Sequence, residues 1–202
     1  MVAQYFSHVD TWVFDLDNTL YPPEADLFGQ TDARFSAYVT RLTGMDSEQS
    51  RSLCVAYWRE YGSTLTGLMA HHDVDPHHFL ADVHDIDLSH LEEDEALSQA
   101  ISQLPGRRIV FTNGSENHAK RVLAARGLTR RFDAVYGVEH AEFKPKPTHD
   151  AFSNVFLKDG VIPTSAAMFE DEARNLEVPH ALGMRTVHVH EHSTEEDHIH
   201  HH

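Results

Sequence analysis

The chain has 202 residues, of which 41% are hydrophobic, and it carries a formal net charge of −16 at pH 7. Its length and apolar content are enough for one folded domain, or for one domain with an insertion. The strong acidity argues against nucleic-acid polymers as partners, because binding to them requires a basic surface.

The sequence also bears on the cellular compartment. No apolar run approaches the roughly 20 residues that span a bilayer, and the N-terminus lacks a basic stretch followed by an apolar one. Cys54 is the single cysteine, which excludes an intramolecular disulfide. We therefore expect a cytoplasmic protein that does not act at a membrane.

The first predicted element is a buried strand over Thr11–Leu16, because Trp12–Phe14 is an apolar run. Asp15 and Asp17 stand at its C-terminal end, which is where open α/β sheets bind their ligands. One carboxylate in such a place can attack phosphorus, while the other gives a proton to the leaving oxygen and later takes one from water. The alternative is a polar turn, which is the commoner explanation of a DxD motif found alone.

About 90 residues separate Asp17 from the next predicted strand, whereas a parallel crossover needs roughly a dozen. The surplus must form an inserted element, and its pattern is helical. Apolar residues recur at helical spacing from Phe28 to Leu42, and Asp75-Pro76 provides an N-cap and a first-turn proline for a helix through about His84. The stretch Asp94–Leu104 is expected to return to the core.

The second strand is predicted over Arg108–Thr112, followed by a helix over Asn117–Arg126. Thr112 and the backbone amides of Asn113 and Gly114 lie between them and would form an anion site suited to phosphate oxygens. The alternative is an ordinary strand-to-helix turn with an N-cap.

A third strand over Ala134–Val138 precedes Lys144-Pro145-Lys146-Pro147, after which apolar residues from Ala151 to Phe156 follow helical spacing. A lysine held between prolines ahead of a helix can balance the charge of a carboxylate nucleophile and a phosphate. The alternative is a solvated basic loop.

The fourth strand, over Ala166–Phe169, ends at the adjacent acids Glu170 and Asp171, and a helix over Glu172–Leu182 and a fifth strand over Arg185–His190 follow. Hard oxygen ligands from two strand ends, completed by water and a substrate phosphate, suit Mg²⁺ rather than zinc. Paired acids are equally good capping residues at the start of a helix.

The chain has 18 histidines, some of them adjacent, as in His71-His72 and over His198–His202. Neighbouring histidines rarely converge on one ion and no HExxH spacing occurs, so a structural metal is not expected there. The acidic tail from Glu191 to Asp197 is predicted to be solvated.

Taken in order, the four polar segments resemble the motifs of the haloacid dehalogenase-like superfamily of phosphohydrolases, over about Thr11 to Val189. The resemblance implies an α/β fold with a Rossmann-like core, in which helices flank a parallel sheet. It also implies the site residues, with Asp15 the nucleophile, Asp17 the general acid/base, Lys146 the charge-balancing lysine and Thr112, Asn113 and Gly114 the phosphate-binding loop.

The same resemblance implies an Mg²⁺ cofactor, held by Asp15, the Asp17 carbonyl, Asp171 and Glu170. Dehalogenases of the superfamily lack an acid two residues after the nucleophile, so Asp17 favours phosphate chemistry.

Both lysines of the third motif precede a proline, and the resemblance decides between them. Members of the superfamily commonly place an aromatic residue six positions after the functional lysine, which here pairs Lys146 with Phe152 and Lys144 with Asp150. We therefore predict that Lys146 faces the phosphate and that Lys144 lies closer to solvent.

The insertion resembles the helical, C1-type cap of the superfamily, which closes over the site and selects substrates. The expected organisation is a catalytic core over residues 1–21 and 93–190, a cap over residues 22–92 and an acidic, histidine-rich tail over residues 191–202. A helical bundle that only enlarges the core is the alternative.

Within the insertion, the segment Tyr57–Leu68 resembles the pyrimidine 5′-nucleotidase branch, as does Tyr21 in its motif near the nucleophile. Tyr21, Tyr57, Arg59 and Tyr61 are therefore candidate substrate residues, since aromatic rings and an arginine can stack on and pair with a nucleobase. Aromatic residues at helical spacing are equally suited to a core.

The resulting expectation is a phosphomonoester hydrolase that forms an aspartyl-phosphate and acts on a small phosphorylated metabolite, here a pyrimidine nucleoside 5′-monophosphate. A phosphatase for sugar phosphates or other small phosphomonoesters is the alternative among hydrolases, and phosphoryl transfer to a second substrate also stays open. A phosphate-sensing regulatory protein is the non-enzyme alternative, although such a protein has no need of a proton donor at Asp17.

Overall fold

Five parallel strands form the central sheet in the order β3-β2-β1-β4-β5. Their bounds are Thr11–Phe14 (β1), Arg107–Phe111 (β2), Ala134–Tyr136 (β3), Ala166–Glu170 (β4) and Arg185–His188 (β5). All five strands were predicted from the sequence, each to within two residues at either end. The parallel α/β fold expected from the motifs is therefore confirmed.

The structure is a computed structural model that describes residues 2–192 and 196–202. It divides the chain into two compact units: a core unit, Met1–Pro22 with Leu91–His202, and a helical unit, Pro23–His90. The helical unit interrupts the core unit between β1 and β2, so the long connection predicted from the sequence is one continuous insertion.

Strand β1 lies at the centre of the sheet, and all four of its residues are buried. A strand covered on both faces and paired on both edges must be apolar throughout. Phe14 lies opposite Val110 of β2 and Phe169 of β4. This register brings the C-terminal ends of three strands to one edge of the sheet, where the polar motifs follow.

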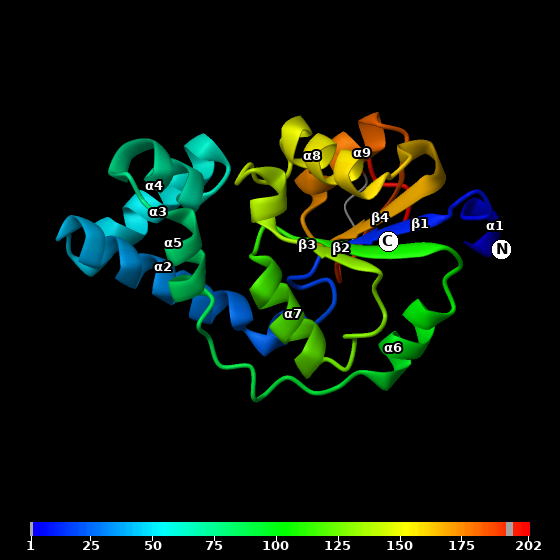
Figure 1. The fold of residues 1–202 in the computed structure, drawn as a ribbon, viewed down its shortest axis with the longest axis horizontal. Helices are drawn as coiled ribbons and strands as arrows, with labels where there is room; N and C mark the ends of the chain where they lie inside the picture. The colour runs from blue at the N-terminus through cyan, green and yellow to red at the C-terminus, as the bar shows by residue number, and fades with distance from the viewer. Residues whose placement is uncertain (1, 193–195) are drawn as a thin grey trace. The chain divides into compact units, whose positions relative to one another are not determined.

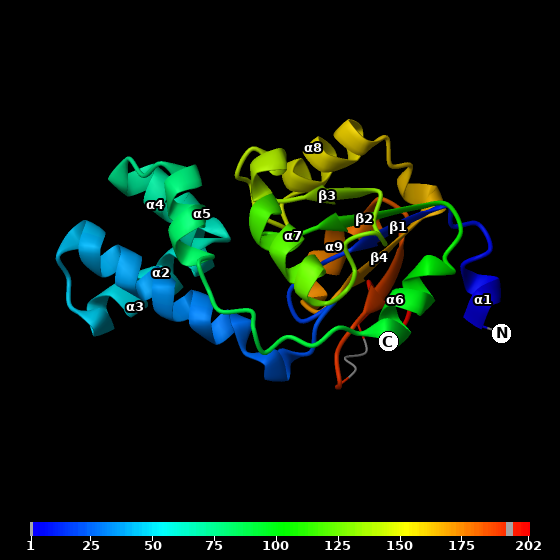
Figure 2. The ribbon, with the colours of Figure 1, turned by 60° about the horizontal axis from the view of Figure 1, so that its bottom comes forward.

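Helices cover both faces of the sheet in the core unit. The helices of this unit are α1 (Val2–Tyr5), α6 (Glu95–Ser102), α7 (Glu116–Ala125), α8 (His149–Asp159) and α9 (Glu177–Ala181), with short 3₁₀ segments at Val138–Ala141, Pro163–Ser165 and Ala173–Leu176. Figures 1 and 2 show α8 and α9 on one face and α6 and α7 on the other. Ser115 caps α7, accepting a hydrogen bond from the His118 amide.

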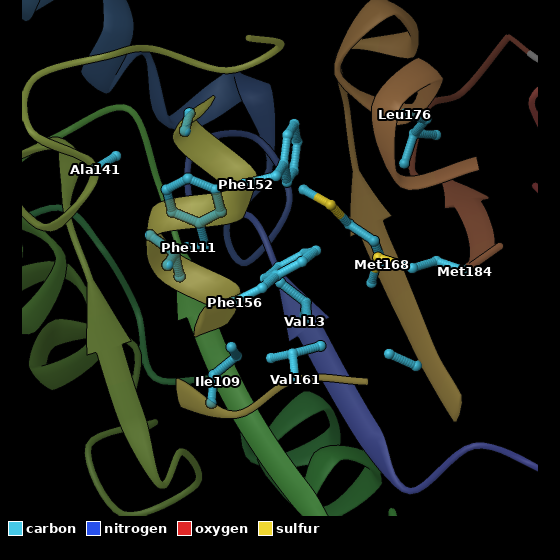
Figure 3. Close-up of a cluster of buried hydrophobic side chains, with 13 residues drawn as sticks. Val13, Ile109, Phe111, Ala141, Phe152, Phe156, Val161, Met168, Leu176 and Met184 are labelled. Atoms are coloured by element: carbon cyan, nitrogen blue, oxygen red, sulfur yellow. The ribbon is translucent and has the colours of Figure 1, made fainter. Parts of the chain in front are cut away.

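The apolar core beneath α8 fixes that helix on the sheet. Phe152 is fully buried and meets Phe111 of β2 edge to face, with ring centroids 5.5 Å apart. Figure 3 shows Phe152 and Phe156 of α8 facing Val13 of β1 and Met168 of β4. Since α8 starts two residues after Pro147, this packing also fixes the loop that carries Lys146.

The single helix predicted over Glu172–Leu182 was wrong. The segment divides into the 3₁₀ turn Ala173–Leu176 and the short helix α9. Pro179 explains the division, because a continuous helix would lose the amide bond at this residue and bring its ring against the Asn175 carbonyl. Pro179 is tolerated in the first turn of a helix that starts at Glu177, where its missing amide has no partner to lose.

The helical unit consists of α2 (Leu27–Thr43), α3 (Ser47–Tyr61), α4 (Thr64–His72) and α5 (Pro76–Val83), preceded by a 3₁₀ turn at Pro23–Ala25. Figure 1 labels these four helices, and Asp75 caps α5 as expected. The apolar face expected on α2 was wrong in detail. Phe28 is 60% exposed, and the buried face begins one residue earlier, at Leu27, and continues through Tyr38 and Val39.

Arg126, at the C-terminal end of α7, ties together the two segments that lead into and out of the insertion. Its guanidinium donates to the Leu20 carbonyl at 3.2 Å, to the Glu92 carbonyl at 2.5 Å and to the Asp94 carboxylate at 2.8 Å. One buried side chain therefore joins the two segments of the core unit that flank the insertion.

The C-terminal residues return to the sheet. Val187 of β5 forms a bridge with His201, and the Thr186 hydroxyl donates to the His198 carbonyl at 2.7 Å. Residues 191, 192, 196 and 197 of the predicted acidic tail are exposed, and residues 193–195 lie outside the described part of the chain. None of the helices within residues 2–192 and 196–202 has both the length and the apolar character to cross a membrane.

Candidate active site

Asp15 and Asp17 leave the end of β1 in a tight turn. The amides of Thr19 and Leu20 both donate to the Leu16 carbonyl, and Asn18 has a left-handed backbone with φ of 56°. Asparagine tolerates this conformation better than most residues with a side chain. The Asp15 carboxylate is buried, whereas the Asp17 side chain stays 31% exposed.

The Lys146 ammonium lies at the centre of the buried charges. It donates to Asp15 at 2.7 Å, to Glu170 at 2.6 Å and to the Phe111 carbonyl at 3.0 Å, and its side chain is 1% exposed. Burial alone would lower the pKa of Lys146, but the two carboxylates hold it above its usual value. Lys146 is therefore a permanent cation next to Asp15.

Lys144 has the opposite environment. Its side chain is 46% exposed and pairs with Asp150 at 2.6 Å, on the following helix. The structure thus places the second lysine of the motif among the carboxylates and the first at the surface, in the register that the aromatic residue at 152 predicts.

The loop after β2 supports these groups with its side chains. Thr112 is fully buried, accepts a hydrogen bond from the Gly114 amide at 2.9 Å and donates to Asp17 at 3.3 Å. The Asn113 side chain accepts from the Lys146 amide at 2.7 Å and donates to the Lys146 carbonyl at 3.2 Å. The Asn113 side chain is therefore used to hold the lysine loop, and its contribution to an anion site would come from the main chain.

Asp15, Glu170 and Asp171 bring carboxylate oxygens within 4.8 Å of one another. Burial and the Glu170 carboxylate raise the pKa of Asp171 to about 8, and the same two causes hold the pKa of Asp15 well above its usual range. This crowding of acids fits a divalent cation, because a hard cation binds carboxylate oxygens and removes their repulsion. Both Glu170 oxygens already accept hydrogen bonds, one from Lys146 and the other from the Glu172 amide, whereas Lys146 occupies only one oxygen of Asp15. Asp15 and Asp171 are therefore the better placed ligands.

Two further residues fix Asp171. Asn18 donates to its carboxylate at 3.2 Å, and the His188 ring contacts its carbonyl at 2.8 Å. Neither residue was predicted from the sequence. Asn18 could have been found, because it follows Asp17 directly, whereas His188 lies on β5 and reaches Asp171 only in the folded sheet.

Asp17 has close neighbours of its own. The Tyr21 hydroxyl donates to one of its oxygens at 2.6 Å, and the His118 ring lies 3.5 Å from the same oxygen. Tyr21 was predicted as a candidate substrate residue; it lies in the core unit, where residues 1–21 were expected, and its hydroxyl bonds to Asp17. His118 was not predicted, since its place in the first turn of α7 gives no sign of a contact with β1.

Residues 12–189 match the family model described as haloacid dehalogenase-like hydrolase. The chain belongs to this family. The matched range includes all four motifs and the whole helical unit, so the haloacid dehalogenase-like resemblance stated from the motifs is confirmed at the level of the family.

Two curated relatives are phosphate-related by name. Phosphate metabolism protein 8 of Saccharomyces cerevisiae is 26% identical over 192 residues, which cover 87% of this chain and 59% of the yeast protein. The fructose-1-phosphate phosphatase of Escherichia coli K12 is 35% identical over 95 residues, which cover 46% of this chain and 50% of that protein. The chain thus spans between half and three-fifths of the length of these relatives.

Solved structures with this fold carry different names and different bound groups. CbbY from Rhodobacter sphaeroides, in complex with phosphate, has a TM-score of 0.63 and 16% identity, covering 96% of this chain and 92% of its own. L-2-haloacid dehalogenase from Xanthobacter autotrophicus has a TM-score of 0.56 and 21% identity, covering 93% and 80%. The magnesium-bound HAD-hydrolase YfnB from Bacillus subtilis has a TM-score of 0.54 and 14% identity, covering 89% and 86%. At these identities the similarity establishes the fold, and the reaction must be argued from side chains.

Three candidate substrate residues lie on α3 of the helical unit. Tyr57 is buried, with its ring against Gly67 of α4, stacked on His71 at 5.5 Å and bonded through its hydroxyl to His72 at 2.9 Å. Tyr61 contacts the His71 ring at 2.7 Å, and Arg59 is exposed. Tyr57 therefore packs α3 against α4, and Arg59 is the most accessible of the three.

A second group of possible metal ligands lies at the start of α7, where Glu116, Glu139 and His140 have ligand atoms within 4.8 Å of one another. The Gly137 amide donates to Nδ1 of His140 at 3.2 Å, so a neutral His140 carries its proton on Nε2. That nitrogen faces Glu116 at 3.7 Å, and Lys120 also pairs with Glu116. Glu116 is thus held by Lys120 and faced by Nε2 of His140, so its contacts are made within the surface of the core unit.

Proposed function

We propose that the chain is an Mg²⁺-dependent phosphomonoester hydrolase that works through an aspartyl-phosphate on Asp15. The observation that carries this proposal is a pair of carboxylates two residues apart. Asp15 is buried and held by the Lys146 ammonium at 2.7 Å, whereas Asp17 is partly exposed and accepts a hydrogen bond from the Tyr21 hydroxyl. A dehalogenase has a use for the first carboxylate but not for an acid at the second position. Family membership supports the hydrolase class, and the names of the two curated relatives support phosphate chemistry.

In the proposed first step, an Asp15 oxygen attacks phosphorus and the bond from phosphorus to the ester oxygen breaks. The proton on Asp17 passes to that leaving oxygen, so an alcohol departs rather than an alkoxide. Lys146 stays fully charged and opposes the negative charge of the nucleophile and the phosphoryl group. In the second step Asp17 takes a proton from water, the water oxygen attacks the phosphoryl group, and inorganic phosphate and free Asp15 result.

The carboxylates of Asp15 and Asp171 would hold the Mg²⁺, with Glu170 and the Asp17 carbonyl as the remaining proposed protein ligands. When bound, the metal supplies charge neutralisation and orientation of the phosphoryl oxygens. Thr112 and the main chain of Asn113 and Gly114 would bind the other phosphate oxygens. These roles agree with the positions at the sheet edge where the register collects the three strand ends.

For the substrate, we propose a pyrimidine nucleoside 5′-monophosphate selected by the helical unit acting as a cap, with the core over residues 1–21 and 93–190 and the cap over residues 22–92. The support is the segment Tyr57–Leu68, which carries an accessible Arg59 and the tyrosine hydroxyls. A small sugar phosphate is the second candidate, because one curated relative is named as a fructose-1-phosphate phosphatase.

Release of inorganic phosphate from a substrate panel tests both levels of the proposal. The purified chain would be incubated with and without Mg²⁺ on UMP, CMP, AMP, GMP, fructose 1-phosphate and p-nitrophenyl phosphate. We expect Mg²⁺-dependent release, fastest with UMP or CMP, and none from Asp15→Asn. Equal rates on purine and pyrimidine nucleotides, or activity confined to fructose 1-phosphate, would refute the pyrimidine proposal. No release from any ester would refute the phosphatase and favour a phosphate-sensing protein.

A further inference from the structure

Tyr21 lies four residues after Asp17, beyond the left-handed turn at Asn18. Its side chain is 2% exposed, and its hydroxyl donates to Oδ1 of Asp17 at 2.6 Å. The phenol is the donor in this bond, because an ionised carboxylate has only acceptor oxygens.

The two oxygens of Asp17 have different surroundings. Oδ1 accepts the short bond from Tyr21 and lies 3.5 Å from the His118 ring. Oδ2 has a longer contact, 3.3 Å, with the Thr112 hydroxyl, which can turn about its own bond. An oxygen already accepting a short hydrogen bond is the poorer place for a proton, so Oδ2 is the oxygen able to carry and release one.

We propose that Tyr21 is a positioning residue for proton transfer: its hydroxyl holds the Asp17 carboxylate so that Oδ2 carries the exchanged proton toward the leaving oxygen. This inference rests on the proposed phosphatase function. It assigns Tyr21 to the reacting end of the site and not to recognition of the substrate base. The ring packs in the core unit, and only the hydroxyl is needed for the role.

The leaving group of the substrate separates this role from a structural one. An alkyl phosphate needs a proton on its leaving oxygen, whereas p-nitrophenolate departs without one. We expect Tyr21→Phe to lower kcat/KM by about 10- to 100-fold for the better of UMP and fructose 1-phosphate, a part of the 10²–10⁴-fold that proton transfer contributes. The loss with p-nitrophenyl phosphate should stay below about threefold. An equal loss on both classes of ester would overturn the proposal.

A double-mutant cycle asks whether Tyr21 acts through Asp17. In the Asp17→Asn background there is no carboxylate left to position, so Tyr21→Phe should change kcat/KM by less than about twofold. Multiplying losses would mean an independent effect on the fold and would overturn the role. Tyr136→Phe is the matched control, because the Tyr136 hydroxyl also donates to a carboxylate of the core unit, Asp159, at 2.7 Å, outside the site. This control should show no dependence on the leaving group.

The hydrogen bond itself can be read without metal or substrate. A short bond from a phenol to a carboxylate should give a low-field hydroxyl proton in the NMR spectrum of the metal-free protein. We expect this resonance to be lost in Tyr21→Phe, to move upfield in Asp17→Asn and to persist in Tyr136→Phe. A spectrum without it in the wild-type protein would overturn the inference. If the resonance is present but no ester is hydrolysed, the proposed function fails, and the catalytic role of Tyr21 fails with it.

Discussion

The edge of the sheet in the core unit and the pair α3–α4 in the helical unit use polar side chains in opposite ways. At the sheet edge, Asp15, Lys146 and Glu170 are each no more than 5% exposed, and the lysine ammonium donates to both carboxylates. On α3 and α4, two tyrosine hydroxyls pair with two histidine rings near the surface. Buried charges are costly unless each has a partner, whereas neutral polar pairs near water cost little. The side chains at the sheet edge are therefore fixed by their charged partners, whereas those on α3 and α4 are fixed by packing of the two helices.

Asp15→Asn should have the largest effect, because the amide cannot attack phosphorus and is a poorer metal ligand. We expect loss of phosphate release to the detection limit, with the circular dichroism spectrum of the wild-type chain. Asp150→Asn, at the exposed partner of Lys144, is the control and should keep turnover. Normal turnover by Asp15→Asn would remove the basis for treating the sheet edge as the reacting site.

Lys146→Ala should come next. It leaves two buried carboxylates and a phosphate facing one another, which should cost several kcal/mol of transition-state stabilisation, on the scale of other electrostatic groups in active sites. Lys144→Ala should cost less than about 1 kcal/mol, since it loses one exposed ion pair. Parallel steady-state kinetics compare the two variants, and a larger loss from Lys144→Ala would contradict the arrangement of charges.

The pair of lysines also shows what the sequence can predict. The strands and the polar residues after them follow from local patterns, and the aromatic spacing from Lys146 to Phe152 chooses between two lysines that differ by only two positions. Phe152 belongs to α8 and is fully buried against Phe111 of the sheet, so it anchors the helix that follows the lysine loop. The local pattern identifies Phe152 as the residue that packs on the sheet, and the position of Lys146 in the preceding loop follows from it.

Other features depend on contacts between distant segments and were not predicted. His118 and His188 reach the acids from α7 and β5, and no local pattern marks either residue. Tyr21 was predicted as a candidate substrate residue, because an aromatic residue near the nucleophile can contact either the substrate or the catalytic acid and the two uses look alike in sequence. Pro179 was visible, but its effect on a helix depends on where the helix starts, and this is set by the preceding 3₁₀ turn.

Without bound Mg²⁺, the repulsion among the crowded acids should lower the free energy of unfolding. The pKa of Asp171 is raised from its ordinary value of 3.8 to about 8, so the folded chain binds more protons than the unfolded chain between these values. The free energy of unfolding of the metal-free protein should therefore fall as the pH rises from about 4 to about 8. Mg²⁺ should raise the melting temperature more at pH 8 than at pH 5, and Asp171→Asn should flatten both trends. A metal-free protein that becomes more stable across this range would contradict the buried-acid cluster.

Gly67→Ala tests the packing of α3 against α4 in the helical unit. A Cβ at this position would lie 2.3 Å from Cγ of the Tyr57 ring, so α3 and α4 must separate or the ring must move. Overpacking of this kind costs about 1–3 kcal/mol, partly offset by about 1 kcal/mol of better helix propensity. Thermal unfolding measures the result, with Gly44→Ala as a control in which the added methyl meets no neighbour but the backbone φ of 74° is strained. Unchanged stability in Gly67→Ala would mean that Tyr57 is not fixed against α4.

Tyr57→Phe should have the smallest effect and separates the two interpretations of α3 most directly. The variant keeps the buried ring on Gly67 and removes only the hydroxyl that contacts His72 at 2.9 Å. Loss of one neutral hydrogen bond near the surface should lower the free energy of unfolding by about 1 kcal/mol or less and leave KM unchanged within about twofold. Arg59→Ala is the comparison, because this side chain is exposed and its removal should raise KM if α3 contacts the nucleotide. If Tyr57→Phe raises KM while Arg59→Ala does not, the tyrosine hydroxyl binds substrate, and α3 is part of the substrate site rather than only a packing helix.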